Sequence, residues 1–254
     1  MLHKTHPFFG FLQPNSFKKG DTIVLMKGIT KRFPGVIANY KIDFDLKYGE
    51  VHALLGENGA GKTTLVSILY GIHKPDEGEI YVYGRKVRFK SPRDAIRLGI
   101  GMVHQHPRLV DSLTVAENIA LGLKGVSLLR PLNEIEDLIR EYSEKYHLKV
   151  DPRAKVWQLT AGEKQRVAIL RVLISGAKIL ILDEPTTSLS PLEREELFNA
   201  IKVLVNEGTS IIFISHKLKE VLEISDRITV LRKGRKIGTL PASEATPEIL
   251  VKMM

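Results

Sequence analysis

The sequence contains no cysteine among its 254 residues, which excludes a disulfide scaffold, thiol catalysis and a cysteine-ligated metal and fits a cytosolic protein. It also lacks any apolar run near the roughly 18 residues that a membrane-spanning helix needs. The apolar runs Ile179–Leu182 and Ile211–Ile214 have instead the length of buried strands. Apolar and charged residues make up 43% and 26% of the chain, so disorder, collagen and coiled coil are poor interpretations.

Acidic residues are scarce relative to basic ones. The chain has 38 lysines and arginines against 29 aspartates and glutamates, which gives a formal net charge of +9 and a pI near 9.6. This balance favours an anionic ligand, a nucleic acid or an anionic membrane surface, without choosing among them.

The first twenty residues carry three lysines, no acid and an aromatic cluster of Phe8, Phe9 and Phe11 beside Leu12. The apolar stretch is too short for a signal peptide, and no small-residue cleavage site follows it. We therefore expect residues 1–21 to be an extension that precedes the folded domain. A peripheral membrane contact is one interpretation of its composition, and a packed or frayed tail is the other.

From Thr22 onward, short apolar runs alternate with helix patterns, which is typical of a parallel α/β sheet. Helix starts are indicated by capping boxes that begin at Ser91, Thr114 and Ser190, each with an acid three residues later. The expected strands are Ile23–Met26, Ile42–Leu46, Val51–Leu55, Glu79–Tyr83, Gly101–Val103, Lys178–Leu182, Ser210–Ile214 and Ile228–Leu231.

The stretch 106–165 interrupts this alternation, because it has helix patterns and no convincing strand. We expect it to be a helical insertion within one α/β domain that covers residues 22–254. Lys233-Gly234 has the composition of a hairpin turn late in the chain.

A glycine-rich segment follows the expected strand Val51–Leu55, opens a helix over Lys62–Leu69 and fits the phosphate-loop pattern without a gap. In this pattern successive backbone N–H groups and the helix N-terminus point at phosphate oxygens. Lys62 reaches the β- and γ-phosphates, and Thr63 offers its hydroxyl to Mg²⁺. The sequence therefore predicts a nucleotide site formed by Gly56, Glu57, Asn58, Gly59, Ala60, Gly61, Lys62, Thr63 and Thr64.

A second part of this site is expected where the apolar strand Lys178–Leu182 ends in Asp183 and Glu184. An aspartate at the carboxyl end of a strand can hold Mg²⁺ through water. The neighbouring glutamate is then placed to polarise an attacking water. Alone, the segment is equally well explained as a buried strand before a solvated turn, but the phosphate loop favours the catalytic interpretation.

The segment Leu159–Val167 resembles the signature of ATP-binding cassette (ABC) ATPases, which usually contains Leu-Ser-Gly-Gly-Gln. A small hydroxyl residue and a glycine open a helix there, so its N-terminal N–H groups can face a phosphate. In the family this segment serves ATP held by another cassette, so the resemblance implies a site shared between two cassettes. The residues concerned are Thr160, Ala161, Gly162 and Glu163. As an isolated motif the segment is also an ordinary helix start.

Three further residues stand where the family places site residues. Phe33, 23 residues before Gly56, would stack on adenine, with core packing as the alternative. Gln105 resembles the Q-loop glutamine, whose amide touches Mg²⁺ and senses the γ-phosphate; the histidines beside it lack the further ligands of a metal cluster. His216 resembles the switch histidine, which would hydrogen-bond the γ-phosphate and orient water or Glu184.

The resemblance covers residues 22–254 and implies an α/β P-loop NTPase (RecA-like) core, an antiparallel β subdomain and an inserted α-helical subdomain. Residues 99–106, 109–111, 114–119 and 215–221 resemble importers of the ribose and nucleoside type, and within these the branch served by a basic membrane lipoprotein. The ATPase of that branch is normally one chain of about twice this length with two cassettes. We therefore expect an amino-terminal half or a single-cassette relative.

Two positions depart from the family pattern. Ala161 stands where a glycine, or in this branch often a valine, is expected, and Ser190 stands where most cassettes have the D-loop aspartate. Ser190 is also explained as the N-cap of the next helix. Both positions would face the shared interface, so they put equal hydrolysis at the two composite sites in doubt while leaving binding through the phosphate loop unaffected.

The resemblance implies the ATPase subunit of a sugar or nucleoside importer, peripheral on the cytoplasmic face of the membrane and without nucleic acid. Its partners would be ATP with Mg²⁺, a second cassette, transmembrane permease subunits and, indirectly, an extracytoplasmic binding lipoprotein. One alternative is a soluble ABC ATPase acting on ribosomes or nucleic acid, which the charge permits but no coiled-coil arm supports. A phosphate-loop kinase or GTPase is disfavoured by the signature segment and by the absence of an Asn-Lys-x-Asp pattern.

Overall fold

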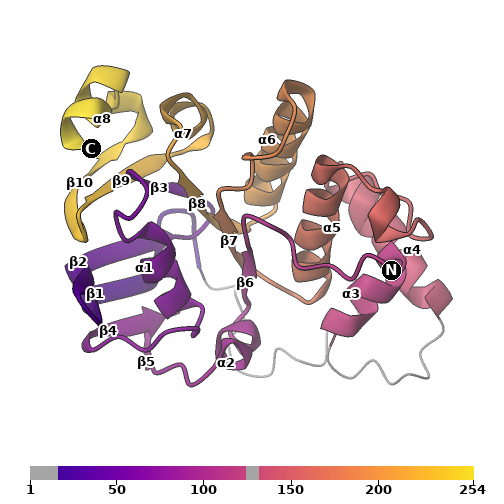
Figure 1. Ribbon diagram of the computed structural model, residues 1–254, viewed down its shortest axis with the longest axis horizontal. Coiled ribbons are helices and arrows are strands. Elements are labelled where there is room, and N and C mark those ends of the chain that lie inside the picture. The colour runs from indigo at the N-terminus through magenta and orange to yellow at the C-terminus, as the bar shows by residue number, and fades with distance from the viewer. Residues whose placement is uncertain (1–16, 124–131) are drawn as a thin grey trace.

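The computed structural model describes residues 17–123 and 132–254, which form two sheets and a set of helices (Figure 1). The strands are β1 (Thr22–Phe33), β2 (Val36–Lys47), β3 (Val51–Leu55), β4 (Glu77–Val82), β5 (Arg85–Val87), β6 (Ile100–Val103), β7 (Ile179–Asp183), β8 (Ser210–Ser215), β9 (Arg227–Arg232) and β10 (Arg235–Pro241). The helices are α1 (Lys62–Leu69), α2 (Pro92–Arg97), α3 (Val115–Gly122), α4 (Leu132–Lys145), η2 (Val156–Gln158), α5 (Ala161–Ile174), α6 (Pro191–Asn206), α7 (Leu218–Ile224), η3 (Ala242–Glu244) and α8 (Pro247–Met253).

The larger sheet has six strands in the order β10-β9-β3-β8-β7-β6. Strands β9, β3, β8, β7 and β6 run parallel, and β10 returns antiparallel to β9. Every residue of β3, β7 and β8 is buried, as expected for parallel strands that are covered on both faces and therefore apolar throughout. The prediction of a parallel α/β sheet is confirmed for this part of the chain.

The smaller sheet is antiparallel, with strand order β2-β1-β4-β5, and alternation alone did not predict it. Strands β1 and β2 extend well beyond the apolar runs that were expected, because their ends carry polar or exposed residues that local hydrophobicity does not mark as strand. The short strand β5 was missed, since Arg85–Val87 offers a single apolar side chain. The antiparallel subdomain implied by the family resemblance is therefore present.

The strand order places four loops at one edge of the larger sheet. Strands β3, β8, β7 and β6 are neighbours and parallel, so the segments that follow them leave the sheet at the same carboxyl edge. In open α/β sheets this edge is where ligands bind. All predicted site residues of the phosphate loop, the Asp183-Glu184 turn, Gln105 and His216 lie on these segments.

The region between β6 and β7 is helical in its described part, where α3, α4 and α5 pack on one another (Figure 1). Three of the four capping boxes at Ser91, Thr114, Thr160 and Ser190 open helices of eight or more residues. Buried Val115, Ile119 and Ile135 join these helices to the core that also contains β7. The domain limits 22–254 and 106–165 stay predictions.

The chain is already packed before Thr22. Phe17 lies against Tyr83, with ring centroids 5.5 Å apart, and the amide of Gly20 donates to the carbonyl of Tyr48. The predicted aromatic cluster at Phe8–Leu12 lies outside the described residues. No helix in residues 17–123 and 132–254 is both long and apolar enough to cross a bilayer.

Candidate functional site: a phosphate loop facing two carboxylates

The phosphate loop is held by backbone that approaches it closely from two sides. A side chain at Gly61 would meet the carbonyl oxygen of Ala38 at 2.3 Å, and one at Gly56 would meet that of Leu231 at the same distance. The turn between β9 and β10 also contributes, because the amide of Gly234 donates to the carbonyl of Ala60 at 3.2 Å. The glycines of the pattern are therefore required by packing as well as by loop conformation.

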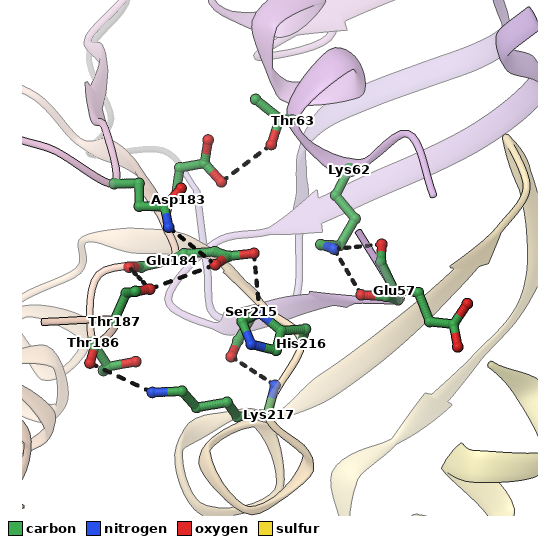
Figure 2. Close-up of polar contacts among 12 residues, drawn as sticks. Glu57, Lys62, Thr63, Asp183, Glu184, Thr186, Thr187, Ser215, His216 and Lys217 are labelled. Carbon is green, nitrogen blue, oxygen red and sulfur yellow. Dashed lines mark hydrogen bonds and ion pairs between the residues drawn. The ribbon is translucent and has the colours of Figure 1, made fainter. Parts of the chain in front are cut away.

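Lys62 begins α1 and is almost fully buried, with 5% of its surface exposed. Its ammonium curls back over the loop and donates to the carbonyls of Gly56 at 2.6 Å and Glu57 at 2.9 Å (Figure 2). Burial lowers the pKa of Lys62, and the nearby carboxylates of Glu184 and Asp183 oppose that shift. Because this buried ammonium is bonded only to neutral carbonyls, it can exchange them for the oxygens of an anion that enters the loop.

Asp183 is the last residue of β7 and faces the phosphate loop. Its Oδ1 lies 3.4 Å from the hydroxyl of Thr63, which donates to it across the gap between the two loops (Figure 2). Burial raises the pKa of this carboxyl, and the negative charge of Glu184 adds to the rise. Thr63 and Asp183 therefore offer hard oxygen ligands side by side, which suits Mg²⁺. In the part of the chain that the structure describes, no group of three or more His, Cys, Asp or Glu side chains is arranged to hold a metal ion.

Glu184 is the centre of a polar group that draws on three loops (Figure 2). Its Oε1 lies 3.1 Å from Nδ1 of His216, and its Oε2 accepts a 3.4 Å hydrogen bond from the amide of Gln105. The backbone of Glu184 is left-handed, with φ 47°, a conformation that a non-glycine residue adopts only where the surrounding contacts impose it. The carboxylate is thus oriented by a histidine and an amide, as a general base must be.

Phe33 ends β1 beside the turn to β2 and is half-buried. Its ring meets the edge of the His73 ring with centroids 5.3 Å apart, and Nζ of Lys31 lies 5.4 Å from its centroid. Phe33 does not belong to the core clusters of the described chain, so core packing does not account for it. The ring is thus partly exposed at the end of β1.

The signature segment opens α5. Thr160 is the N-cap: its hydroxyl accepts from the amide of Glu163, whose carboxylate accepts from the amide of Thr160. The hydroxyl of Thr160 also donates to Oε1 of Glu193 at 3.1 Å, and a side chain at Gly162 would meet that same oxygen at 2.3 Å. No hydrogen bond or ion pair links residues 160–163 to residues 56–64 within the part of the chain that the structure describes.

Ser190 acts as the N-cap of α6, as the alternative interpretation of this position requires. Its hydroxyl accepts from the amide of Glu193 at 3.3 Å, and its amide donates to the carboxylate of Glu193 at 2.9 Å. The same carboxylate thus joins the start of α6 to the signature segment. The capping-box pattern indicated the first of these contacts, but no local signal indicated the bond to Thr160.

Sequence reasoning missed two buried polar residues at the site. Asn39 is fully buried and donates its amide to the carbonyl of Gly61 at 3.0 Å. Glu220, 2% exposed, accepts from the hydroxyls of Thr186 and Ser215 behind the Glu184 turn. No local pattern pointed to these contacts, because each joins segments far apart in the chain.

Comparisons with known proteins show the family to which the chain belongs. Residues 40–187 match the family described as ABC transporter. The chain is 48% identical over 237 residues to the nucleoside import ATP-binding protein NupA of Lactococcus lactis, covering 92% of this chain and 46% of that protein. It is also 48% identical over 230 residues to the ribose import ATP-binding protein RbsA 1 of Rubrobacter xylanophilus, covering 90% and 46%. The chain therefore spans about half the length of these relatives.

Among solved structures, the fold is similar to that of cbiO1 from Clostridium perfringens, described as part of the ABC transporter complex cbiONQ. The TM-score is 0.79 at 31% identity, over 91% of this chain and 93% of the other. The expected α/β P-loop fold and the similarity to nucleoside- and ribose-import ATP-binding proteins are confirmed. The phosphate loop, the paired carboxylates and the family match together assign this chain to the ABC transporter family.

Proposed function

We propose that this chain is the ATP-hydrolysing cassette of an ABC importer for a nucleoside or sugar. The observation that carries the proposal is the meeting of Lys62, Thr63 and Asp183 with the Glu184–His216 pair at one edge of the parallel sheet. The named functions of the relatives, import of nucleosides and ribose, support the substrate class.

Nucleotide binding begins with the phosphates in the loop Gly56–Thr64. Backbone N–H groups of the loop donate to the phosphate oxygens, and the partial positive charge at the N-terminus of α1 stabilises their negative charge. The Lys62 ammonium exchanges its carbonyl partners for the β- and γ-phosphate oxygens. Phe33 stacks on the adenine at the other end of the nucleotide. Such stacking contributes about 1 kcal/mol.

Mg²⁺ would be held by Thr63, Asp183 and Gln105, whose hydroxyl, carboxylate and amide oxygens fit a hard cation. When bound, the ion neutralises phosphate charge that develops during phosphoryl transfer. The raised pKa of Asp183 supports this assignment, because an added cation restores the charged form that burial disfavours.

Hydrolysis then depends on Glu184. Its carboxylate takes the proton of a water as that water attacks the γ-phosphorus, and the bond from phosphorus to the β-bridging oxygen breaks to leave ADP and phosphate. His216 orients Glu184 through the 3.1 Å contact and donates to the γ-phosphate with its other nitrogen. Gln105, bonded to the same carboxylate, reports nucleotide occupancy to the helical region.

The proposed site is completed by a second cassette, whose signature segment would cover the γ-phosphate. In this chain Thr160, Ala161, Gly162 and Glu163 would serve the partner's nucleotide, with Ser190 at the same interface. Permease subunits would dock against the helical region at the cytoplasmic face of the membrane, and a binding lipoprotein would deliver cargo from the other side.

The test is steady-state hydrolysis by the purified chain over a hundredfold range of protein concentration, with light scattering in parallel. ATP can drive pairing only by its higher affinity for the paired form. Activity should therefore rise roughly with the square of concentration until pairing saturates, while ATP binding saturates in the monomer. Flat specific activity in a chain that stays monomeric would show that the site is complete within one chain and would revive the kinase or GTPase interpretation.

A further inference from the structure

A buried carboxylate lies directly behind the Glu184–His216 pair, outside the residues that would touch nucleotide. Glu220 is on α7 and only 2% exposed. Its Oε2 accepts from the hydroxyl of Thr186 at 2.6 Å and from that of Ser215 at 3.3 Å. Its Oε1 lies 3.1 Å from the ammonium of Lys217. One side chain thus contacts both the turn after β7 and the segment after β8.

These contacts fix the two segments that bear the reactive pair. Thr186 is two residues from Glu184, and Ser215 immediately precedes His216. The Lys217 amide donates to the Ser215 hydroxyl at 3.0 Å, and its ammonium reaches the Thr186 carbonyl at 3.5 Å (Figure 2). The left-handed backbone at Glu184 needs such outside support, because it is unfavourable on its own.

The contacts of the cluster engage both carboxyl oxygens of Glu220. Both hydroxyls and the ammonium donate to Glu220, so its side chain must accept at both oxygens. An amide of the same size has only one oxygen and would turn an NH₂ group toward the Lys217 ammonium or the two hydroxyls. The network is therefore sensitive to charge and not only to shape.

We propose that Glu220 is a positioning residue for hydrolysis, which clamps the 184–187 turn to the 215–217 segment and so holds Glu184 against His216. This inference rests on the proposed function for its effect on turnover. The clamp itself is a property of the free chain and can be measured without nucleotide.

The test compares Glu220→Gln with Glu50→Gln in the full chain. Glu50 is a suitable control because it is also buried, at 6% exposure, and accepts bonds from the Lys47 amide and Arg227 before the amino end of β3. Hydrogen exchange of the nucleotide-free protein should rise at least tenfold in residues 184–189 and 215–217 of the Glu220 variant. Those residues should exchange as in the wild type in the Glu50 variant.

Turnover supplies the second measurement, at a protein concentration where the wild type hydrolyses ATP. Glu220→Gln should lower kcat at least tenfold with the Kd of ATP within twofold, whereas Glu50→Gln should leave both within twofold. Thr186→Val should lower kcat in the same direction, and Thr186→Ser, which keeps the hydroxyl, should restore it.

The outcomes are separable. Unchanged exchange in residues 184–189 and 215–217 of Glu220→Gln overturns the clamp whether or not the chain hydrolyses ATP. Raised exchange with unaltered kcat overturns the positioning role. A wild-type chain without turnover at any concentration refutes the proposed function, and the exchange data still decide whether the clamp exists.

Discussion

The two ends of the parallel sheet both bury acidic side chains, but they treat them differently. At the amino end, Arg227 forms a bidentate pair with Asp45 at 2.8 and 2.9 Å and reaches Glu50 at 3.1 Å. At the carboxyl end, Asp183 and Glu184 lie side by side, and the nearby Lys62 ammonium bonds to carbonyls instead.

The pKa directions follow this difference. Burial alone would raise the pKa of Asp45, yet the hydrogen bond and charge of Arg227 bring it below its usual range. Burial also raises the pKa of Asp183, and there Glu184 adds to the rise while Thr63 and Lys62 oppose it only in part. At the amino end the carboxylates are therefore paired with Arg227. At the carboxyl end Asp183 and Glu184 carry more negative charge than the nearby cations offset. Such an excess of negative charge favours the uptake of a cation at this end of the sheet.

The largest expected effect comes from breaking the carboxyl end. Glu184→Gln removes the proposed base and should lower turnover by about 10²- to 10⁴-fold, the usual loss when a general base is removed. Binding of ATP should be retained, because Glu184 is not part of the phosphate loop. Phosphate release and equilibrium nucleotide binding measure the two quantities, and turnover within threefold of wild type would exclude Glu184 from this role.

Breaking the amino end should affect stability and leave the site intact. Arg227→Met removes the partner of Asp45 and Glu50, so both carboxylates lose their cation. Full burial makes such a loss worth roughly 3–5 kcal/mol, and partial exposure of this pair reduces the expectation to about 2–3 kcal/mol. Urea unfolding gives the change directly. A variant with weakened ATP binding but unaltered unfolding midpoint would contradict the division of roles.

Removing one charge at each end should move stability in opposite directions. The depressed pKa of Asp45 means that its ionised form stabilises the fold above the unfolded pKa, and that this contribution is lost as pH falls through the lower folded value. The raised pKa of Asp183 means that its ionised form opposes folding at neutral pH. At pH 7, in nucleotide-free protein, Asp45→Asn should lower stability and Asp183→Asn should increase it, each by on the order of 1 kcal/mol. Thermal unfolding at pH 7 checks both signs. At pH 4 the gain from Asp183→Asn should shrink, because its raised pKa lets the carboxyl take up a proton, whereas most of the loss from Asp45→Asn should remain.

The smallest effect is expected at the adenine end. Phe33→Ala should weaken ATP binding several-fold, in line with about 1 kcal/mol of stacking. The melting temperature of the nucleotide-free chain should hardly change, because the ring is half-buried at the end of β1. Ile29→Ala, in the buried part of the same strand, is the matched comparison and should destabilise strongly. Equal destabilisation by both changes would return Phe33 to a packing role.

Local patterns predicted those parts of the site that are continuous in the chain. Each of these parts can be recognised in a window of about eight residues: the phosphate loop, the strand before Asp183 and the capping boxes. Loop conformation, strand burial and helix capping are short-range effects, and this is why. The contacts of Asn39, Glu193 and Glu220 join residues 22, 33 and 34 positions apart. Nothing within a short window specifies such partners, so these residues became visible only when the fold brought their elements together.

The strand boundaries show the same limit. The apolar runs predicted the inner parts of β1 and β2, but the pairing of these two strands with each other carries β1 on to Phe33 and starts β2 at Val36. The family resemblance implied the antiparallel subdomain and the order of motifs, whereas the periodicity of the residues did not. What the residues themselves specify most strongly is therefore the parallel core and its carboxyl edge.

The turn at Gly234 has a consequence for engineering the chain. Hairpin tips usually accept insertions, labels and circular-permutation breaks. Here the amide of Gly234 donates to the carbonyl of Ala60 and its carbonyl accepts from the amide of Tyr40, while an added methyl group would meet the carbonyl of Ile37 at 2.8 Å. A turn some 170 residues downstream of the phosphate loop therefore packs against that loop and helps to hold its backbone in place. A reporter inserted at this tip would deform the phosphate loop, so fusions intended to follow nucleotide binding belong elsewhere on the surface.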